Sequence, residues 1–575
     1  MIRPLSLVPV LLGLLSVFPG NVVAQDAHHP EITIAHKGIT QLKEDIKLML
    51  DLSKADERHW ENWDGVIELF AFGLDYDRPI RVDVLSGLTP APLMIYGAYT
   101  EPIDDLLHEN LESADFVPKK ITDTLYEMQE PEIGWFRILP NQKYAILIQS
   151  TKPNHNLLKQ LIQKPGDPMP GILEVLAGKA NVGVQLVNKA QTVEDQNKRT
   201  ASFADTRAER MGLLQKRPQE STTEFDLRKG ILTVYLDEVE RLIVEAAAAK
   251  AQASLNAKTL NASMTFEAQG IENSSFAKSI ALIGKAEDAF ASVKKAEGSA
   301  LSFRVNHPID ELRQKNTKVI VDLLRADVAA RLKSPEADLT EPQKEASQKI
   351  FDGIAEVILD GVAEGNLNVF IESVPNDDGK FVTWGAVVAK DARRIDEALK
   401  LLPDTGEGNE ANMAIETVNG VNIHQIKLRK GFLRIFDDVF GTDNDVYIAT
   451  SDDMVWFATG PKSLDSLKKA IAALEGPADT DVILTVEAEL RPWVKRALEI
   501  TEAKAEPSDL DQQQTRREIL LRLKQAVEAL TEADDDIKFS MGIEEDTVSG
   551  ALLLNTGMLR FAGTQLETFS KNSLE

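Results

Sequence analysis

Residues 482–487 read Val-Ile-Leu-Thr-Val-Glu, with large apolar or β-branched side chains at alternate positions. This alternation is typical of a strand that buries one face. Residues 491–531 follow, where apolar side chains recur with the 3.6-residue period of an amphipathic helix. Alternating runs return at 537–543 and 548–554. The stretch therefore predicts one strand, then helix, then a pair of strands.

The same order occurs at two earlier places in the sequence. The alternating runs are Val-Gly-Val-Gln-Leu-Val at 182–187 and Ala-Leu-Ser-Phe-Arg-Val at 300–305. After the first run, the sequence predicts a helical tract at 190–252 and a strand at 262–268. After the second, it predicts a helical tract at 308–362 and strands at 367–374 and 381–389. Residues 376–379 read Asn-Asp-Asp-Gly. Because Asp-Gly accepts the positive φ angles of a tight turn, this stretch predicts a hairpin.

A longer similarity relates the two halves of the chain. Residues 97–107 and 385–399 share the end of a strand and then the helix string Ile-Asp-acid-x-Leu. Segments 135–161 and 446–471 follow at the same relative place, each predicting two strands and a helix. We interpret residues 31–298 and 299–575 as related halves, in which no set of reactive polar residues recurs.

These patterns predict the α+β class, with repeated modules of mixed or antiparallel sheet covered by long amphipathic helices. The predicted regions are 1–24 as a signal peptide, 25–178 as a first α+β module region, 179–298 as a strand plus long-helix unit, 299–402 as a second such unit, 403–478 as a hairpin and helix module, and 479–575 as a third strand plus long-helix unit.

The first residues are typical of a secretory signal. Arg3 precedes an apolar run over 5–18, a Pro-Gly pair and Val-Val-Ala, so we expect cleavage after Ala24. The apolar run is shorter than the roughly 20 residues that a membrane-spanning helix needs, and no later stretch is long enough. We therefore expect an exported protein, periplasmic or extracellular, with no transmembrane segment after cleavage.

Composition excludes several kinds of site. The chain has no cysteine, which rules out disulfides, thiolate metal sites and thiol nucleophiles. A formal net charge of −27 repels phosphate backbones, so we expect no nucleic-acid partner. Apolar residues make up 43% of the chain, enough to build several cores.

No complete phosphate-binding loop, zinc motif, nucleophile elbow or calcium loop occurs. Catalytic residues are therefore unknown, and the sequence predicts no cofactor, cofactor-binding residue or metal ligand. His28 and His29 lie in a tail where either adventitious metal binding or a disordered terminus is expected. For His424 an exposed strand position, and for His307 the start of a helix, is the more ordinary interpretation than a catalytic base.

Three other groups of residues each have a functional and a structural interpretation. Acids at 443, 445, 452 and 453, and those at 534–536 and 544–546, suit either calcium or ordinary turns. Trp60 and Trp63 suit either a sugar- or peptide-binding platform or the packing face of a helix. The cations between Lys198 and Arg217 suit an acidic partner, the protein's own acidic surface, or a solvated helix face.

The order of strand, paired helices, hairpin and helix, together with the Asp-rich hairpin from Asp443 to Trp456, resembles large exported proteins of unknown function in planctomycete-like bacteria. The resemblance implies an envelope location and offers no activity.

The leading hypothesis is a non-enzymatic exported protein of the bacterial envelope, with a binding or scaffold role and a protein or small-ligand partner. One alternative is an extracellular hydrolase, which predicts a deep cleft with a carboxylate or histidine of perturbed pKa. The other is an apolar-ligand carrier, which predicts an enclosed apolar cavity. A scaffold predicts a broad patch of exposed apolar or aromatic side chains instead.

Overall fold

The structure is a computed structural model. It describes residues 31–85, 92–107, 117–128, 134–149, 155–163, 165–177, 180–218, 220–283, 285, 287–334, 337–428, 434–441, 445–504, 510–531 and 534–574. The predicted signal peptide, His28, His29 and Asp443 lie outside the described residues.

The chain divides into two compact units, neither of which is continuous in sequence. Unit 1 consists of Met1–Leu213, Glu238–Ala277 and Met558–Glu575. Unit 2 consists of Leu214–Asp237 and Lys278–Gly557.

Unit 1 contains an antiparallel sheet whose described strands pair in the order β10, β9, β8, β1, β2, β3, β7, β6, β5, β4. Their bounds are β1 Glu31–His36, β2 Ile80–Val84, β3 Leu93–Ala98, β4 Pro118–Thr122, β5 Leu125–Met128, β6 Gly134–Leu139, β7 Tyr144–Gln149, β8 Val182–Val187, β9 Ala246–Asn256 and β10 Asn261–Gly270.

In unit 1, α4 (His155–Gln163) packs on β6 and β7, and α5 (Met169–Val175) packs on β1 and β8. The apolar residues of α4 lie four positions apart, at Leu158 and Ile162, so they share one helix face. Both are fully buried against Tyr144 and Ile146, which point the same way because they are two positions apart on the strand. Helix α6 (Val193–Leu213) leads to α7 (Thr222–Glu245), and α7 leads to β9.

The last helix of the chain, α16 (Thr556–Ser573), packs in unit 1 against α2 (Ile39–Ser53) and α3 (Glu57–Ala71). Trp63 of α3 donates from Nε1 to the carbonyl oxygen of Leu566 at 3.2 Å and stacks on Phe569 with ring centroids 5.4 Å apart. Gly563 makes the approach possible, because a Cβ there would overlap the carbonyl oxygen of Met49. Unit 1 is therefore completed by residues from both ends of the sequence.

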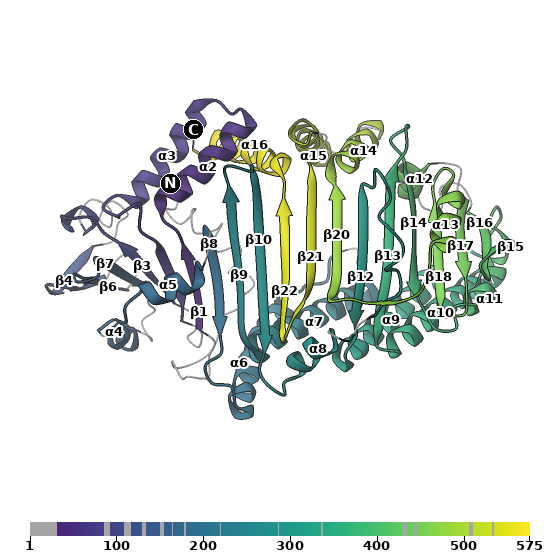
Figure 1. Ribbon diagram of the computed structural model, residues 1–575, viewed down its shortest axis with the longest axis horizontal. Coiled ribbons are helices and arrows are strands. Elements are labelled where there is room, and N and C mark those ends of the chain that lie inside the picture. The colour runs from purple at the N-terminus through teal and green to yellow at the C-terminus, as the bar shows by residue number, and fades with distance from the viewer. Residues whose placement is uncertain are drawn as a thin grey trace. The chain divides into compact units, whose positions relative to one another are not determined.

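Unit 2 contains a second antiparallel sheet, with described strands in the order β22, β21, β20, β12, β13, β14, β18, β17, β16, β15 (Figure 1). Their bounds are β12 Leu301–Pro308, β13 Asn366–Pro375, β14 Phe381–Val388, β15 Glu410–Val418, β16 Val421–Lys427, β17 Asp445–Thr450, β18 Met454–Thr459, β20 Val482–Glu489, β21 Asp536–Glu544 and β22 Thr547–Leu554.

The pairing order of unit 2 matches that of unit 1 strand for strand, with β12 in the place of β1 and β22 in the place of β10. In both sheets a strand is followed by two helices and a hairpin. This happens four times, after β1, β8, β12 and β20. The sequence predicted the last three of these strands and missed the one at β1.

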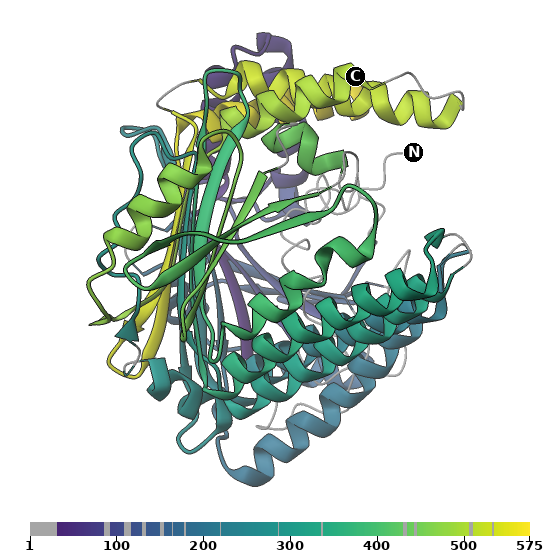
Figure 2. The ribbon, with the colours of Figure 1, turned by 90° about the vertical axis from the view of Figure 1, so that its right-hand side faces the viewer.

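The helices of unit 2 lie on both faces of its sheet. Helix α13 (Ser463–Ala472) packs on one face against Phe370 and Trp456, whereas α10 (Glu341–Ala363) packs on the other face with α11 (Arg394–Lys400). Figure 2 shows α9 (Glu311–Lys333) and α10 together on one side of this sheet. The remaining bounds are α8 Ser275–Ile283, β11 Glu287–Asp288, the short 3-10 helix Leu402–Thr405, α12 Arg434–Phe440, β19 Ala478–Asp479, α14 Leu490–Ala503 and α15 Leu510–Ala529.

The two faces of the sheet differ between β13 and β22. One register row across five strands consists of Ile371, Phe303, Val486, Phe539 and Leu552, all only half-buried. Side chains one position along point to the opposite face. There the matching row is Glu372, Ser302, Glu487, Lys538 and Leu553, so this row is polar on four of its five strands.

The α+β prediction is confirmed, and the sheets are antiparallel in every described pairing. The predicted helical tract 190–252 is wrong at its end, because α7 stops at Glu245 and Ala246–Asn256 forms β9. Its four consecutive alanines favour helix locally. However, β9 pairs with β8 on one side and β10 on the other, so two sets of backbone hydrogen bonds outweigh that preference. Within the described residues, no helix has the length and apolarity needed to span a bilayer.

Candidate functional site

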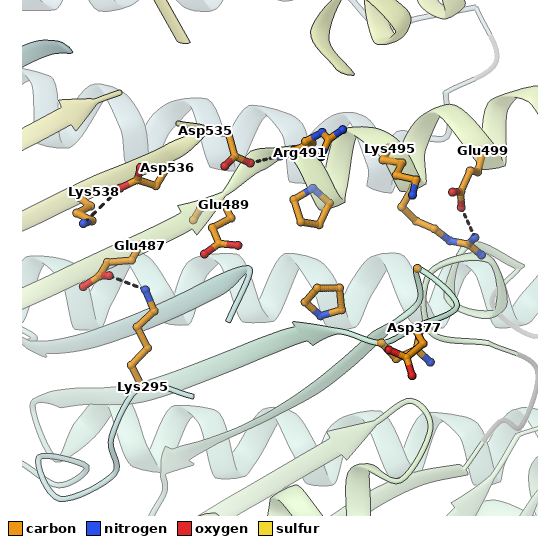
Figure 3. Close-up of a pocket in the computed structure, with 16 residues that line it drawn as sticks. Lys295, Asp377, Glu487, Glu489, Arg491, Lys495, Glu499, Asp535, Asp536 and Lys538 are labelled. Carbon is orange, nitrogen blue, oxygen red and sulfur yellow. Dashed lines mark hydrogen bonds and ion pairs between the residues drawn. The ribbon is translucent and has the colours of Figure 1, made fainter. Parts of the chain in front are cut away.

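A pocket of about 450 Å³ lies within unit 2, where β20 passes into α14 (Figure 3). Its other walls are the turn between β13 and β14, the start of β21, and Lys295 from the loop before β12. Small-molecule sites typically have volumes of roughly 300–1,000 Å³. The pocket is therefore large enough for a small-molecule ligand or a short peptide.

Helix α14 supplies one wall because its lining residues recur every three or four positions and so share a face. They are Arg491, Pro492, Lys495, Arg496 and Glu499.

Two contacts fix the position of α14. The Asp535 carboxylate, almost completely buried, accepts a hydrogen bond from the backbone N–H of Arg491 at 2.6 Å. It therefore satisfies one of the amides that the first turn of a helix leaves without an intrahelical partner. Trp493 stacks on the fully buried ring of Phe381 at 3.7 Å, with the planes 7° apart, and donates to the carbonyl oxygen of Ala300 at 3.0 Å.

The turn between β13 and β14 forms the opposite wall. The Asn376 side-chain oxygen accepts hydrogen bonds from the backbone N–H groups of Asp378, at 3.0 Å, and Lys380, at 2.9 Å. Gly379 has φ +69°, which glycine adopts without steric cost. The predicted hairpin is confirmed, and its turn places Pro375 and Asp377 beside the pocket.

The lining is dominated by charge, with six acidic and five cationic side chains. Several of them neutralise one another. Lys295 Nζ lies 2.6 Å from a carboxylate oxygen of Glu487, and Arg496 Nη1 lies 2.9 Å from one of Glu499. Lys538 lies 3.3 Å from Asp536.

Three lining charges have no described partner for their side chains: Asp377 in the turn, Glu489 and Lys495. Glu489, at the end of β20, has no hydrogen bond or ion pair from its carboxylate to any described residue. Partial burial raises its pKa, and the neighbouring carboxylates of Asp535 and Asp536 raise it further, whereas Lys295 lowers it. Lys495 is exposed and likewise has no described side-chain partner.

The arrangement suits recognition of a charged ligand. A cation beside Glu489 would relieve the repulsion among the three carboxylates and would replace the water that their ionised forms require. Within the described part of the chain, no three His, Cys, Asp or Glu side chains converge as the ligands of a metal ion would. An organic ammonium group therefore fits this end of the pocket better than a metal ion.

The structure corrects the interpretation of His424 as an exposed strand residue, because only 1% of it is exposed. Its Nδ1 accepts from the backbone N–H of Ala414 at 2.9 Å, which leaves the proton on Nε2, 3.1 Å from Asp396. Burial lowers the pKa of His424 although Asp396 raises it. His307 lies near the end of β12 and precedes α9 rather than starting it, with Nε2 3.3 Å from Arg313.

The acidic turns do not assemble a calcium site within the described residues. Asp452 pairs with Arg393 at 2.5 Å, and Asp453 accepts a hydrogen bond from Ser451 at 2.9 Å. Asp534 to Asp536 serve turn and strand contacts, among them the Asp535 contact to α14. Asp443 lies outside the described residues.

The tryptophan pair belongs to a packing face, because Trp63 is 9% exposed and lies in the core between α2, α3 and α16. A histidine beside it makes a triad-like contact: His59 Nδ1 lies 3.1 Å from Ser570 Oγ, and Nε2 lies 3.8 Å from Glu567. Ser570 is fully buried, so its hydroxyl cannot reach a substrate. This cluster joins α3 to α16.

Two cations of the stretch between Lys198 and Arg217 make contacts within unit 1. Arg199 is 2% exposed and donates to the carbonyl oxygens of Val244, at 3.0 Å, and Ala190, at 2.7 Å. Arg207 pairs with Glu240 at 2.6 Å. Contacts to the protein's own surface therefore account for these two cations.

Sequence reasoning missed Glu489 and Lys495, because nothing in their local sequence separates them from other charged residues. The usable signal was indirect. The strand 482–487 and the Asp-Gly turn were both predicted, and Glu489 follows that strand directly.

No family model and no curated protein matches the sequence. Two solved structures, crystal forms IV and III of TP0453, match 44% and 45% of this chain and 79% and 80% of theirs. Sequence identity is 9% and 10%, and the TM-score is 0.22 for both. A score this low carries no argument about function.

Proposed function

We propose that the protein is an exported, non-enzymatic binding protein of the bacterial envelope, and that the pocket of unit 2 binds a small ligand through an ammonium group. The observation that carries the binding site is the Glu489 carboxylate, which has a raised pKa and no described partner. Export rests on the sequence of residues 1–24.

The charge arrangement supports binding over catalysis. Asp535 is held by the α14 amide and Asp536 by Lys538, so Glu489 is the one of these three neighbouring carboxylates left to meet a ligand. General acid-base chemistry on a polar substrate usually needs a second positioned group beside the first. The other acids of the lining with described partners are already in ion pairs with Lys295 and Arg496.

The matching strand order of the two units supports a further part of the proposal, that the chain is a tandem repeat. Unit 1 has the same succession of strand, two helices and hairpin but shows no recurrence of the Glu489 environment in sequence. One copy of the fold then supplies the pocket, and the other serves a structural role.

The test is calorimetric titration of the full chain, purified without its signal peptide, with n-butylammonium chloride. The neutral analogue 1-butanol is titrated in parallel. We expect the ammonium compound to bind and butanol not to bind. Glu489→Gln should abolish the heat of binding, because the amide keeps the shape but removes the charge.

Glu528→Gln is the matched control, because Glu528 is an exposed acid of α15 in the same unit and outside the pocket. Binding that survives Glu489→Gln, or is lost equally in Glu528→Gln, would contradict the proposal. Chemical conversion of the bound amine, detected by mass spectrometry, would instead support the enzyme alternative.

A second candidate function, an apolar-ligand carrier, is favoured by the half-buried row of Ile371, Phe303, Val486, Phe539 and Leu552. Side chains left in this state attract hydrocarbon because burial stabilises by roughly 25 cal/mol per Å². Native mass spectrometry of the purified protein tests this: a copurified lipid that is lost in Phe303→Asp would support the carrier, and a ligand-free protein would count against it.

A further inference from the structure

We propose that the ligand of this pocket is a zwitterion with its charges at opposite ends, a di- or tripeptide with free termini, whose ammonium group meets Glu489 and whose carboxylate meets Lys495. The inference rests on the proposed function and adds the second charge and its distance from the first.

The first step is that Glu489 and Lys495 do not satisfy each other. They line the same pocket with opposite charges, yet no ion pair joins them within 4.0 Å. In Figure 3 Glu489 lies on the side of Asp535 and Asp536, whereas Lys495 lies on the side of Glu499. Glu489 and Lys495 therefore lie on different sides of the pocket, and Asp377 lies on the side of Lys495.

The second step is the charge balance of the remaining lining. Lys295 with Glu487, Arg496 with Glu499, and Lys538 with Asp536 are already paired. Asp377, in the turn, has no described partner, as is also true of Glu489 and Lys495. A ligand with a single charge would leave the group at the other end without a counterion. A zwitterion supplies both counterions at once and leaves the overall charge of the site unchanged.

The third step is length. Glu489 immediately precedes α14 and Lys495 is six positions later, so a rise of 1.5 Å per residue separates them by about 9 Å along the helix. An extended peptide spans roughly 3.3–3.6 Å per residue, so two or three residues cover this distance and a single amino acid does not. Pro375 and Pro492 give the lining apolar surface for the intervening chain.

The test compares four probes by calorimetric titration of the full chain: triglycine, triglycine amide, N-acetyl-triglycine and glycine. We expect triglycine to bind at least roughly tenfold more tightly than each of the other three, since a hydrogen bond to a charged group contributes about that much. Lys495→Gln should weaken triglycine roughly tenfold and leave triglycine amide unchanged. Lys504→Gln, an exposed lysine just after the same helix and outside the pocket, is the control.

The outcomes separate the two proposals. If n-butylammonium binds through Glu489 but triglycine has no advantage over its amide, or Lys495→Gln leaves triglycine unaffected, the zwitterion inference is wrong and the proposed function stands. If neither triglycine nor n-butylammonium binds, both are wrong. Tighter binding of glycine than of triglycine would overturn the length argument.

Discussion

Gly563→Ala should destabilise unit 1, although alanine is the better helix former. The new Cβ would overlap the Met49 carbonyl oxygen and would lie 2.6 Å from the Met49 carbonyl carbon and 2.9 Å from Ser53 Oγ. Carbon atoms in favourable contact are about 3.5–4.0 Å apart, so α16 would have to move away from α2 by roughly 1 Å. The 3.1 Å contact between His59 and Ser570 would then be lost.

The magnitude follows from two opposing contributions. Replacing glycine inside a helix gains roughly 0.5–1 kcal/mol of intrinsic preference. Forcing extra volume into a packed contact costs about 1–3 kcal/mol. We expect a net loss of about 1–2 kcal/mol in the free energy of unfolding of unit 1. For domains of this size class the unfolding midpoint should fall by roughly 2–4 °C per kcal/mol.

Gly65→Ala is the matched control, because Gly65 is also inside a helix of unit 1 but has no atom within 4 Å of its missing Cβ. It should stabilise by roughly 0.5–1 kcal/mol. The assay is urea denaturation combined with hydrogen-deuterium exchange of peptides from α2, α3 and α16. Equal stabilisation by both substitutions, with unchanged exchange in α16, would refute the close approach of α16 to α2.

Three smaller predictions concern unit 2. Asp310→Ala removes the oxygen that accepts from a backbone amide at 3.1 Å at the start of α9, so the free energy of unfolding should fall by about 1 kcal/mol in urea titrations; an unchanged midpoint would contradict the cap. Trp493→Leu removes the ring stacked on Phe381. The free energy of unfolding should fall by roughly 0.5–1.5 kcal/mol more than the lost apolar burial alone explains, and this excess should disappear when Phe381 is already replaced by leucine. His424 takes up a proton less readily when folded, because its pKa is lowered, so its contribution is complete above its ordinary pKa of 6.5 and decreases as the pH falls below it. His424→Asn should flatten the dependence of the unfolding midpoint on pH in that acidic range, and an unaltered slope would show that other groups cause it.

The sheet strands were the most predictable part of the fold. The predicted runs 482–487 and 182–187 correspond to Val482–Glu489 and Val182–Val187, because alternation of side chains follows directly from strand geometry. Helix and strand were confused at Ala246–Asn256, whose alanines carry no alternation. Only the pairing of β9 with two neighbours decides that segment, and pairing is not a local property.

The pocket was much less predictable for a related reason. Its walls come from 375–379, 487–499, 535–538 and Lys295, which are brought together by strand order. The burial that raises the pKa of Glu489 exists only after β20, β21 and α14 have assembled. The burial of His424 was unpredictable for the same reason. Apolar and polar side chains alternate in its strand, which placed His424 on the exposed face, whereas Asp396 covers it from another element.

The placement of α16 affects how the chain reaches its native state. The contact between His59 and Ser570 joins positions 511 residues apart, so α2 and α3 remain without their cover until α16 has been made. Contacts of such high sequence separation slow folding and leave apolar surface open to aggregation in the meantime. During synthesis from the N-terminus, the apolar faces of α2 and α3 would therefore benefit from a chaperone until α16 is available.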